Sequence, residues 1–177
     1  MDVKGITNPV FWSKVGRNAK GKGSRLEIKN GCFPIGKICF GLQEFDENNR
    51  QVNYISCYLD LDKALLFAKA VELGKLKPDS SDALKPVREF PGGTSAQKAD
   101  RPDHKPIYRS LSLIKGRMWI LTALEGPGKQ TETGGFAPDG KFERKVSVGL
   151  SDEELLTMAT MMESEYQAFR TAQYLKG

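Results

Sequence analysis

Two stretches of the chain decide the fold: ISCYLDLDKALLFA, residues 55–68, and VSVGLSDEELLTMA, residues 146–159, which align without a gap. Each begins with alternating apolar residues, which are typical of a half-buried strand, and continues with apolar residues at helical spacing. Asp60 and Ser151 occupy matching positions at the predicted helix starts, where short polar side chains cap the first turn. Residues 36–44 also resemble residues 116–125, with one inserted residue. The chain is therefore predicted to contain an internal repeat.

The first predicted repeat contains three strands and a helix. Period-two alternation predicts strands over residues 24–29, 37–45 and 52–59, with an Asn30-Gly31 turn after the first. Asp60 begins a helix that runs to Leu73 and ends at Gly74. The residues predicted to point inward are Leu26, Ile28, Ile38, Phe40, Leu42, Ile55, Cys57 and Leu59.

The second predicted repeat follows the same order. Strands are expected over residues 108–114, 117–125 and 141–150, with a Gly- and Thr-rich loop over residues 126–140. The predicted inward residues are Leu111, Leu113, Met118, Ile120, Leu124, Val146, Val148 and Leu150, which leaves Trp119 on the outer face. Ser151 and Glu154 form a capping box for a helix that runs to Tyr174, with an apolar stripe predicted to be core or subunit interface.

The segments predict an α+β fold of two pseudo-symmetric antiparallel sheet-plus-helix repeats, ββββα twice. Residues 1–23 are expected to be a basic flexible arm, 24–74 the first repeat and 107–177 the second. Residues 75–106 contain five prolines and are predicted to cross the surface mostly as coil, with a short edge strand near residues 87–90 as one alternative. Each repeat is too short to bury a sufficient core alone, so both are expected to share one.

Composition narrows the class of protein. The chain has 177 residues, is 39% apolar and 28% charged, and carries a net charge of +5 from 27 basic and 22 acidic residues. It has no apolar run of roughly 18–20 residues and no apolar signal core near residue 1, so we expect neither a membrane protein nor a secreted one. Cys32, Cys39 and Cys57 form no CxxC pair and are expected to be free thiols in the cytoplasm.

Little in the sequence indicates catalysis. A single histidine, His104, and the lack of paired cysteines argue against a zinc site and against histidine-based acid–base chemistry. The acidic residues near residues 60 and 152 lie at helix starts, where the helix dipole accounts for them. The Gly-rich pieces lack the spacing of a phosphate loop. We therefore expect no cofactor, no metal and no enzymatic activity.

Basic and aromatic residues interleave on the predicted outer faces of the sheets. Single-stranded nucleic acid is bound by such surfaces, because cations contact the phosphates and rings stack on the bases. The candidate binding residues are Lys20, Lys22, Arg25, Lys29, Lys37, Tyr54, Tyr58, Arg117, Trp119 and Lys145. A slip of one residue in a strand would exchange its two faces, and with them the assignment of Trp119.

Two stretches and the overall order resemble a known family. KGKGSRL, residues 20–26, resembles the Lys-Gly-Lys-Ala-Ala-Leu segment of the Whirly single-stranded-DNA-binding proteins, with Gly and Ser in place of Ala and one extra residue. Residues 136–161 are similar to the last strand and helix of the related transcriptional positive cofactors. The resemblance implies a Whirly-like fold and sequence-tolerant binding of single-stranded DNA in replication, recombination or repair, and it suits a phage or mobile-element protein.

Two alternatives stay open at the level of sequence. The same scaffold could bind RNA, since recognition of the 2′-hydroxyl depends on geometry. A structural or assembly protein without nucleic-acid binding would instead use the final helix and exposed strand edges for oligomer contacts. A homo-oligomer formed through the C-terminal helix is compatible with all three interpretations.

Overall fold

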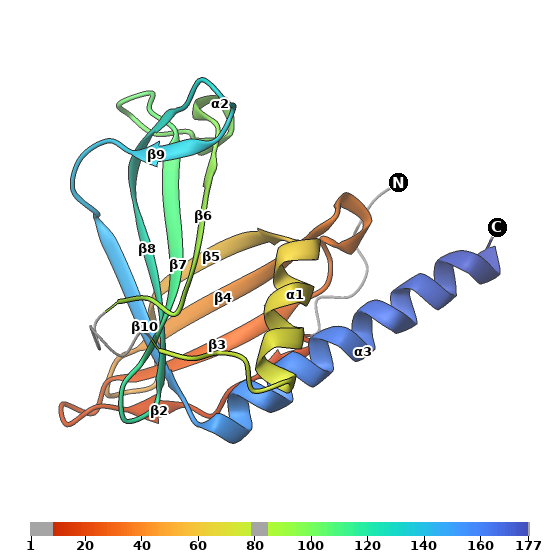
Figure 1. Cartoon of the computed structure of the whole chain (residues 1–177). Helices are drawn as coiled ribbons and strands as arrows, with labels where there is room; N and C mark the ends of the chain where they lie inside the picture. Colours follow the sequence, from red (N-terminus) through yellow and green to blue (C-terminus); the bar gives the residue numbers. More distant parts are fainter. Residues whose placement is uncertain (1–8, 79–84, 177) are drawn as a thin grey trace.

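The computed structural model describes residues 9–78 and 85–176, and its strands form two antiparallel sheets, each followed by a helix (Figure 1). The first sheet has the order β1-β3-β4-β5, with β2 paired to β3. Its elements are β1 (Phe11–Trp12), β2 (Gly16–Arg17), β3 (Gly23–Lys29), β4 (Lys37–Phe45) and β5 (Gln51–Asp60), followed by α1 (Leu61–Glu72). The second sheet has the order β10-β8-β7-β6, with β9 paired to β8. Its elements are β6 (Arg88–Thr94), β7 (Ile107–Lys115), β8 (Trp119–Gln130), β9 (Phe136–Pro138) and β10 (Arg144–Leu150), followed by α3 (Asp152–Lys176). The expected α+β class is confirmed.

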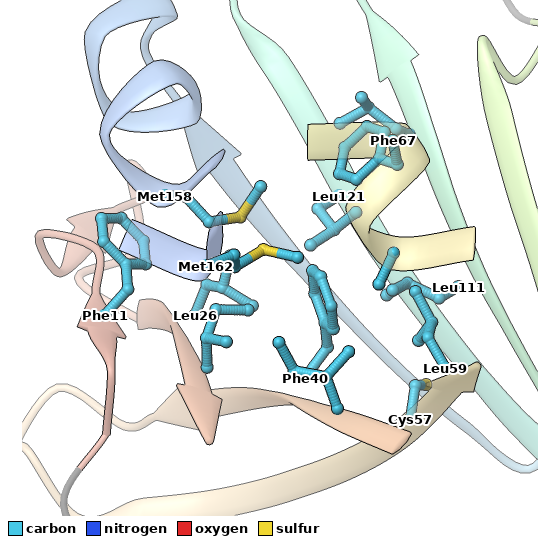
Figure 2. Close-up of a cluster of buried hydrophobic side chains, with 14 of the residues drawn as sticks. Phe11, Leu26, Phe40, Cys57, Leu59, Phe67, Leu111, Leu121, Met158 and Met162 are labelled. Atoms are coloured by element: carbon cyan, nitrogen blue, oxygen red, sulfur yellow. The ribbon is translucent and has the colours of Figure 1, made fainter. Parts of the chain in front are cut away.

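One hydrophobic core joins the two sheets and the two long helices. Leu26 and Phe40 of the first sheet and Leu111 and Leu121 of the second gather around Met158 and Met162 of α3 and Phe67 of α1 (Figure 2). The residues predicted to point inward on β3, β4, β5, β7 and β10 are all buried, and so is the first part of the apolar stripe of α3. Each such side chain contributes about 1.5–3 kcal/mol on burial, so neither sheet could keep this core without the other.

The start of α3 and the end of α1 are as their sequences predict, but the start of α1 is not: Asp60 occupies the N-cap position, makes no side-chain cap hydrogen bond there and pairs instead with Lys37 and Lys63. At the start of α3, the Glu154 backbone N–H donates to Ser151 Oγ at 3.1 Å, and the Ser151 N–H donates to Glu154 Oε2 at 3.0 Å. This reciprocal pair is the predicted capping box. At the end of α1, Gly74 has a φ of 62°, and the N–H groups of Gly74 and Lys75 donate back to Val71 and Ala70. Glycine is favoured there because the left-handed backbone carries no Cβ penalty.

The phase of β8 is opposite to the prediction. Trp119 is only 7% exposed and lies in the core with Leu121 and Ala123, whereas Met118 and Ile120 are exposed. The sequence MWIL offers apolar residues in both phases, so alternation could not decide between them. The indole decides it: Trp119 Nε1 donates to Asp152 Oδ1 at 2.6 Å, so the large ring is buried with its polar atom satisfied. The assignment of Trp119 as an exposed stacking residue is therefore wrong.

The connections between the main strands contain further elements. Residues 88–94 form β6 along the edge of the second sheet, so the alternative of a short edge strand near residues 87–90 is confirmed and the strand extends to Thr94; α2 (Ala96–Ala99) follows it. Pro91 is tolerated because an edge strand has one unpaired side. The predicted turn at Asn30-Gly31 is present, and the short 3₁₀ helix η1 (Phe33–Ile35) follows it before β4 begins. Residues 79–84 of the expected linker lie outside the described residues.

The expected N-terminal arm is partly sheet. β1 pairs with β3 at Ile28 and Glu27, and β2 pairs with β3 at Ser24 and Gly23, so both strands line the edge of the first sheet. Phe11 is buried in the core. Residues 1–8 lie outside the described part of the chain. Among the helices that the structure describes, none is long and apolar enough to cross a membrane.

Candidate nucleic-acid interface

The ten residues predicted to contact nucleic acid lie in different places. Arg25, Lys29 and Tyr54 lie on the outer face of the first sheet, Lys37 and Tyr58 line a pocket at the start of α1, and Lys22 and Lys145 line a groove between the sheets. Lys20 and Arg117 lie in exposed turns before β3 and β8. Trp119 lies in the core. The structure therefore divides the predicted site into separate surfaces that must be judged one by one.

The outer-face cluster consists of Trp12, Arg25, Glu27, Lys29 and Tyr54. Its centre is the Glu27 carboxylate, which is 4% exposed although it lies on the outer face. Lys29 Nζ lies 2.7 Å from Glu27 Oε1, Tyr54 Oη donates to the same oxygen at 2.9 Å, and Trp12 Nε1 donates to Oε2 at 3.3 Å. The carboxylate is thus satisfied by three side chains of the protein itself.

Gly41 of β4 makes room for this cluster. It lies directly opposite Glu27 in the sheet, and a Cβ atom there would lie 2.6 Å from Tyr54 Oη and 2.8 Å from Glu27 Cγ. Such distances are well below van der Waals contact. Any side chain at this position would separate Tyr54 from Glu27, so the glycine is required for the hydrogen bond.

Two pKa values in the cluster are shifted upward, that of Lys29 by its hydrogen bonds and that of Tyr54 by burial. Burial lowers the pKa of Lys29, but the hydrogen bonds to Glu27 and Tyr54 outweigh it, so the net pKa is above its ordinary value. Burial raises the pKa of Tyr54 to about 12, because the buried phenolate is disfavoured. At neutral pH, Lys29 is therefore protonated, and its positive charge is neutralised by the neighbouring Glu27 carboxylate.

Arg25 lies between two aromatic rings at the other end of the cluster. Its guanidinium carbon is 4.4 Å from the centroid of the Trp12 ring and 5.5 Å from that of Phe45, and its Nη2 donates to Gln43 Oε1 at 2.6 Å. Trp12 remains 55% exposed. One face of the indole is thus covered by a cation, and the exposed remainder can stack on a base.

Lys37 and Tyr58 line a pocket of about 600 Å³ between the start of α1 and β6, with Gly92 and Gly93 in its wall. Tyr58 is half exposed. Lys37 is paired with Asp60, which also pairs with Lys63 at 2.8 Å. The hydrogen bonds from Lys37 and Lys63 lower the pKa of Asp60. The acid therefore offsets much of the positive charge that this pocket would offer to a phosphate.

The inter-sheet groove lies between the β2–β3 edge of the first sheet and β10 of the second. Its volume is about 600 Å³, and its cationic lining residues are Arg17, Lys22 and Lys145, with Glu44 as the acid. Its remaining lining residues are Gly16, Asn18, Gly23, Ser24, Met118, Val146, Ser147 and Gly149. Glycine and serine leave the walls low, and Met118 and Val146 contribute to a lining that is mostly apolar. The groove is therefore an open, largely apolar surface that carries three cations and one acid.

The cations of the inter-sheet groove are not neutralised by the protein. Within residues 9–78 and 85–176, no ion pair involves Arg17, Lys22 or Lys145, and none involves Lys20 or Arg117 in the neighbouring turns. Arg17 donates instead to two neutral groups, Gly21 O at 2.5 Å and Asn49 Oδ1. Cations without an ion-pair partner keep mobile counterions, which a polyanion can release.

Asn18 holds the turn that presents the lysines. Its Oδ1 accepts the backbone N–H groups of Lys20 at 3.0 Å and Lys22 at 3.1 Å, and Gly21 adopts a φ of 76° between them. The turn is thus fixed by its backbone, while both lysine side chains remain exposed. The turn therefore fixes where the two lysines leave the backbone, while their side chains keep their rotamer freedom.

Sequence reasoning missed Trp12 and Arg17 as contact candidates. Both fall in the stretch interpreted as a flexible arm, although the run VFW at residues 10–12 is a short strand signal. Trp12 pairs with Glu27 and Arg17 with Gly23 on the same strand, so about 13 Å of β3 separates them. The edge of the first sheet thus joins the exposed indole to the groove.

The thiols and the acidic residues of the described chain form no further site. Burial raises the pKa of Cys57 to about 12 and that of Cys39 to about 11, so both are protonated thiols at neutral pH. All three cysteines are free. In the parts of the chain that the structure describes, no group of His, Cys, Asp and Glu side chains could hold a metal ion.

Comparison of the chain with protein-family models, with curated proteins and with solved structures finds no match. The geometry described above is therefore the basis for any functional conclusion.

Proposed function

We propose that this chain binds single-stranded DNA without strong sequence preference, in a reducing cytoplasm, during replication, recombination or repair. The observation that carries the proposal is the inter-sheet groove, in which Arg17, Lys22 and Lys145 have no ion-pair partner among residues 9–78 and 85–176. Cations of this kind give affinity through counterion release, which requires no base recognition. Free cysteines are in keeping with a reducing compartment.

The path of the strand follows the edge of the first sheet. The sugar–phosphate backbone lies against the groove, and the next bases lie toward Trp12, about 13 Å along β3. Lys20 and Arg117 flank this path from exposed turns. A stacked base contributes about 1–3 kcal/mol on such a ring and does so for any of the four bases.

The arrangement of the fold supports a Whirly-like assignment. Two antiparallel sheets are each followed by a helix, and the aligned stretches of sequence form β5 with α1 and β10 with α3. This order of sheet and then helix is compatible with the one that the resemblance in residues 20–26 and 136–161 implies, although each sheet has five strands where four were expected. A homo-oligomer through α3 belongs to the same proposal, because the last turn of that helix exposes Tyr174 and Leu175.

The test is a fluorescence-anisotropy titration of nuclease-treated protein with a labelled oligo-dT strand, at low and high salt, with duplex DNA and a matching RNA as competitors. We expect binding that weakens steeply with salt and that duplex does not compete. Effective competition by the RNA would instead indicate that the chain is an RNA-binding protein. Failure to bind at low salt would overturn it.

Intrinsic fluorescence tests the stacking assignment within the same titration. The described chain has an exposed indole at Trp12 and a buried one at Trp119. Bound DNA should quench the wild type and Trp119→Phe, but not Trp12→Phe. Quenching that persists in Trp12→Phe and disappears in Trp119→Phe would contradict the path along β3.

The assembly alternative has one observation in its favour. The second half of α3 projects from the body of the protein (Figure 1), and Tyr174 and Leu175 near its end are 74% and 83% exposed. Exposed apolar residues at a helix end are suited to contacts between copies. Sedimentation of the protein without DNA distinguishes the two functions, because an assembly protein should form large oligomers and ignore the oligo-dT strand.

A further inference from the structure

A second groove lies on α1, and none of its lining residues lines the inter-sheet groove. It has a volume of about 470 Å³ and runs between α1 and β6, with Leu66, Phe67, Ala70, Leu73 and Phe90 as its apolar lining. Leu66 is 73% exposed and Leu73 is 57% exposed. Large aliphatic side chains left this open on a helix that packs on a core are typical of an interaction surface.

The apolar residues form a stripe of defined length. Leu66, Ala70 and Leu73 recur at helical spacing on one side of α1, and the stripe from Leu66 to Leu73 spans about 10 Å. Phe67 and Phe90 form the floor, where their rings meet edge to face at a centroid distance of 5.5 Å. This length matches about two turns of a bound peptide helix.

The rim of the groove is strongly basic. Its charged lining residues are Lys63, Lys69, Lys75 and Arg88, against Glu89 alone. Lys69 is paired with Glu72 and Glu163, and Lys63 with Asp60. Within the described residues, the Arg88 side chain donates to the carbonyl of Val87 at 2.9 Å and forms no ion pair. The rim thus keeps positive charge on the side of β6, where an acidic partner would be attracted.

The chemistry of the groove excludes other occupants. Nucleic acid needs open aromatic faces for its bases, but Phe67 is 2% exposed and Phe90 packs on it. A second copy of this chain carries a net charge of +5, which opposes docking on a basic rim. The apolar stripe and basic rim together fit a peptide that has apolar residues on one face and acidic residues beside them.

We propose that the α1 groove binds an acidic amphipathic peptide segment of another protein, with two or three large apolar side chains seated on Leu66, Ala70 and Leu73. The peptide's carboxylates face Arg88 and Lys75 at the rim. Helix-in-groove recognition of this kind depends on the apolar anchors for affinity and on the charges for orientation. The site is independent of the nucleic-acid proposal.

The experiment uses the full chain and a labelled synthetic peptide of Asp, Glu, Leu and Phe, with its apolar residues at helical spacing. The control peptide has the same composition in scrambled order, which removes the apolar face but keeps the charge. We expect the patterned peptide to bind at least tenfold more tightly than the scrambled one. Equal binding of both, or no binding of either, would overturn the proposal.

Three variants locate the binding surface. Leu66→Glu should lower the affinity for the patterned peptide about tenfold, because it removes an apolar anchor and adds charge repulsion. Arg88→Glu should lower the same affinity about fivefold. Lys98→Glu makes the same charge change on an exposed lysine outside the groove and should change the affinity for the peptide less than twofold. Equal losses for Arg88→Glu and Lys98→Glu would show a nonspecific charge effect and overturn the proposal.

Oligo-dT binding by the same variants separates this inference from the proposed function. Leu66 is exposed, so Leu66→Glu should fold and melt like the wild type and should keep its affinity for the strand. A loss of oligo-dT binding in Leu66→Glu that equals its loss of peptide binding would assign the groove to nucleic acid. That result would contradict the peptide proposal, but it would still support the proposal that the chain binds nucleic acid.

Discussion

The inter-sheet groove and the outer-face cluster take their side chains from opposite faces of the same strand. Ser24 of β3 lines the groove, whereas Arg25, Glu27 and Lys29 point to the outer face. In the cluster, Lys29 is held by a carboxylate that is 4% exposed. In the groove, Lys22 and Lys145 have no such partner among the residues that the structure describes. The two basic surfaces therefore offer very different amounts of free charge.

This difference decides which surface can bind a polyanion. A phosphate that approached Lys29 would compete with Glu27, which would be left buried without its cation. A phosphate that approaches Lys22 displaces only mobile ions, and their release favours binding. Free charge, and not the number of basic residues, distinguishes a nucleic-acid surface from a structural one.

The largest expected effect comes from reversing the charge of the groove. We expect Lys22→Glu combined with Lys145→Glu to weaken oligo-dT binding on the order of a hundredfold, about 1.4 kcal/mol for each reversed charge. Anisotropy titration at low salt measures the change. The matched control is Lys98→Glu with Lys129→Glu, which gives the same net charge outside the groove. Equal losses in both pairs would remove the distinction between the groove and the general surface.

The next effect concerns the aromatic ring of the outer-face cluster. We expect Trp12→Ala to weaken the oligo-dT complex about tenfold, because one stacked base is lost, while Trp12→Phe keeps most of the affinity. Trp12 is 55% exposed, so neither variant should lower stability by more than about 1 kcal/mol. Unchanged affinity in Trp12→Ala would confine the site to the groove.

Lys29→Ala should separate stability from binding. It removes the cation nearest to the buried Glu27 carboxylate, so we expect the free energy of unfolding to fall by about 1–2 kcal/mol, a value limited by the partial exposure of Lys29. Urea denaturation measures this loss. The affinity for oligo-dT should change less than twofold. A binding loss similar to that of the groove variants would show that Lys29 itself contacts the DNA and would contradict this prediction.

The smallest effect is an alkaline change in stability. The folded pKa of Tyr54 is about 12, above its ordinary value near 10, so the folded state keeps this proton longer than the unfolded state. The stability contributed by Tyr54 is present below about pH 10 and is lost as the pH rises toward 12. Urea denaturation across this range should show a shallower loss in Tyr54→Phe than in the wild type. Identical slopes would contradict the buried position of the phenol.

Most of the fold could be predicted from the sequence because its strands alternate clearly. Leu26 and Ile28, like Val146 and Val148, have polar or small neighbours, so only one phase could face the core. Around Trp119 both phases are apolar, and the choice depended on Asp152, which lies 33 positions away. Only the first half of β6 was indicated, as an alternative, because Pro91 and the two glycines that follow it are residues depleted in strands.

The site was less predictable than the fold. The sequence indicated that Arg25, Glu27 and Lys29 share a face, since they alternate along one strand. It gave no sign that Tyr54 and Gly41 would bury the Glu27 carboxylate, because those residues come from β5 and β4. The groove depends on how β10 lies beside the β2–β3 edge, which is a consequence of packing two sheets on one core.

The salt dependence of oligo-dT binding tests the central claim most directly. It should be measured for the wild type, for Lys22→Ala with Lys145→Ala, and for Lys29→Ala. For single strands each neutralised phosphate contributes about 0.7 to the slope of log affinity against log salt. We predict that the groove pair reduces the slope by about 1.4 and that Lys29→Ala leaves it unchanged. Equal slopes in all three proteins, or a reduced slope in Lys29→Ala alone, would contradict the account.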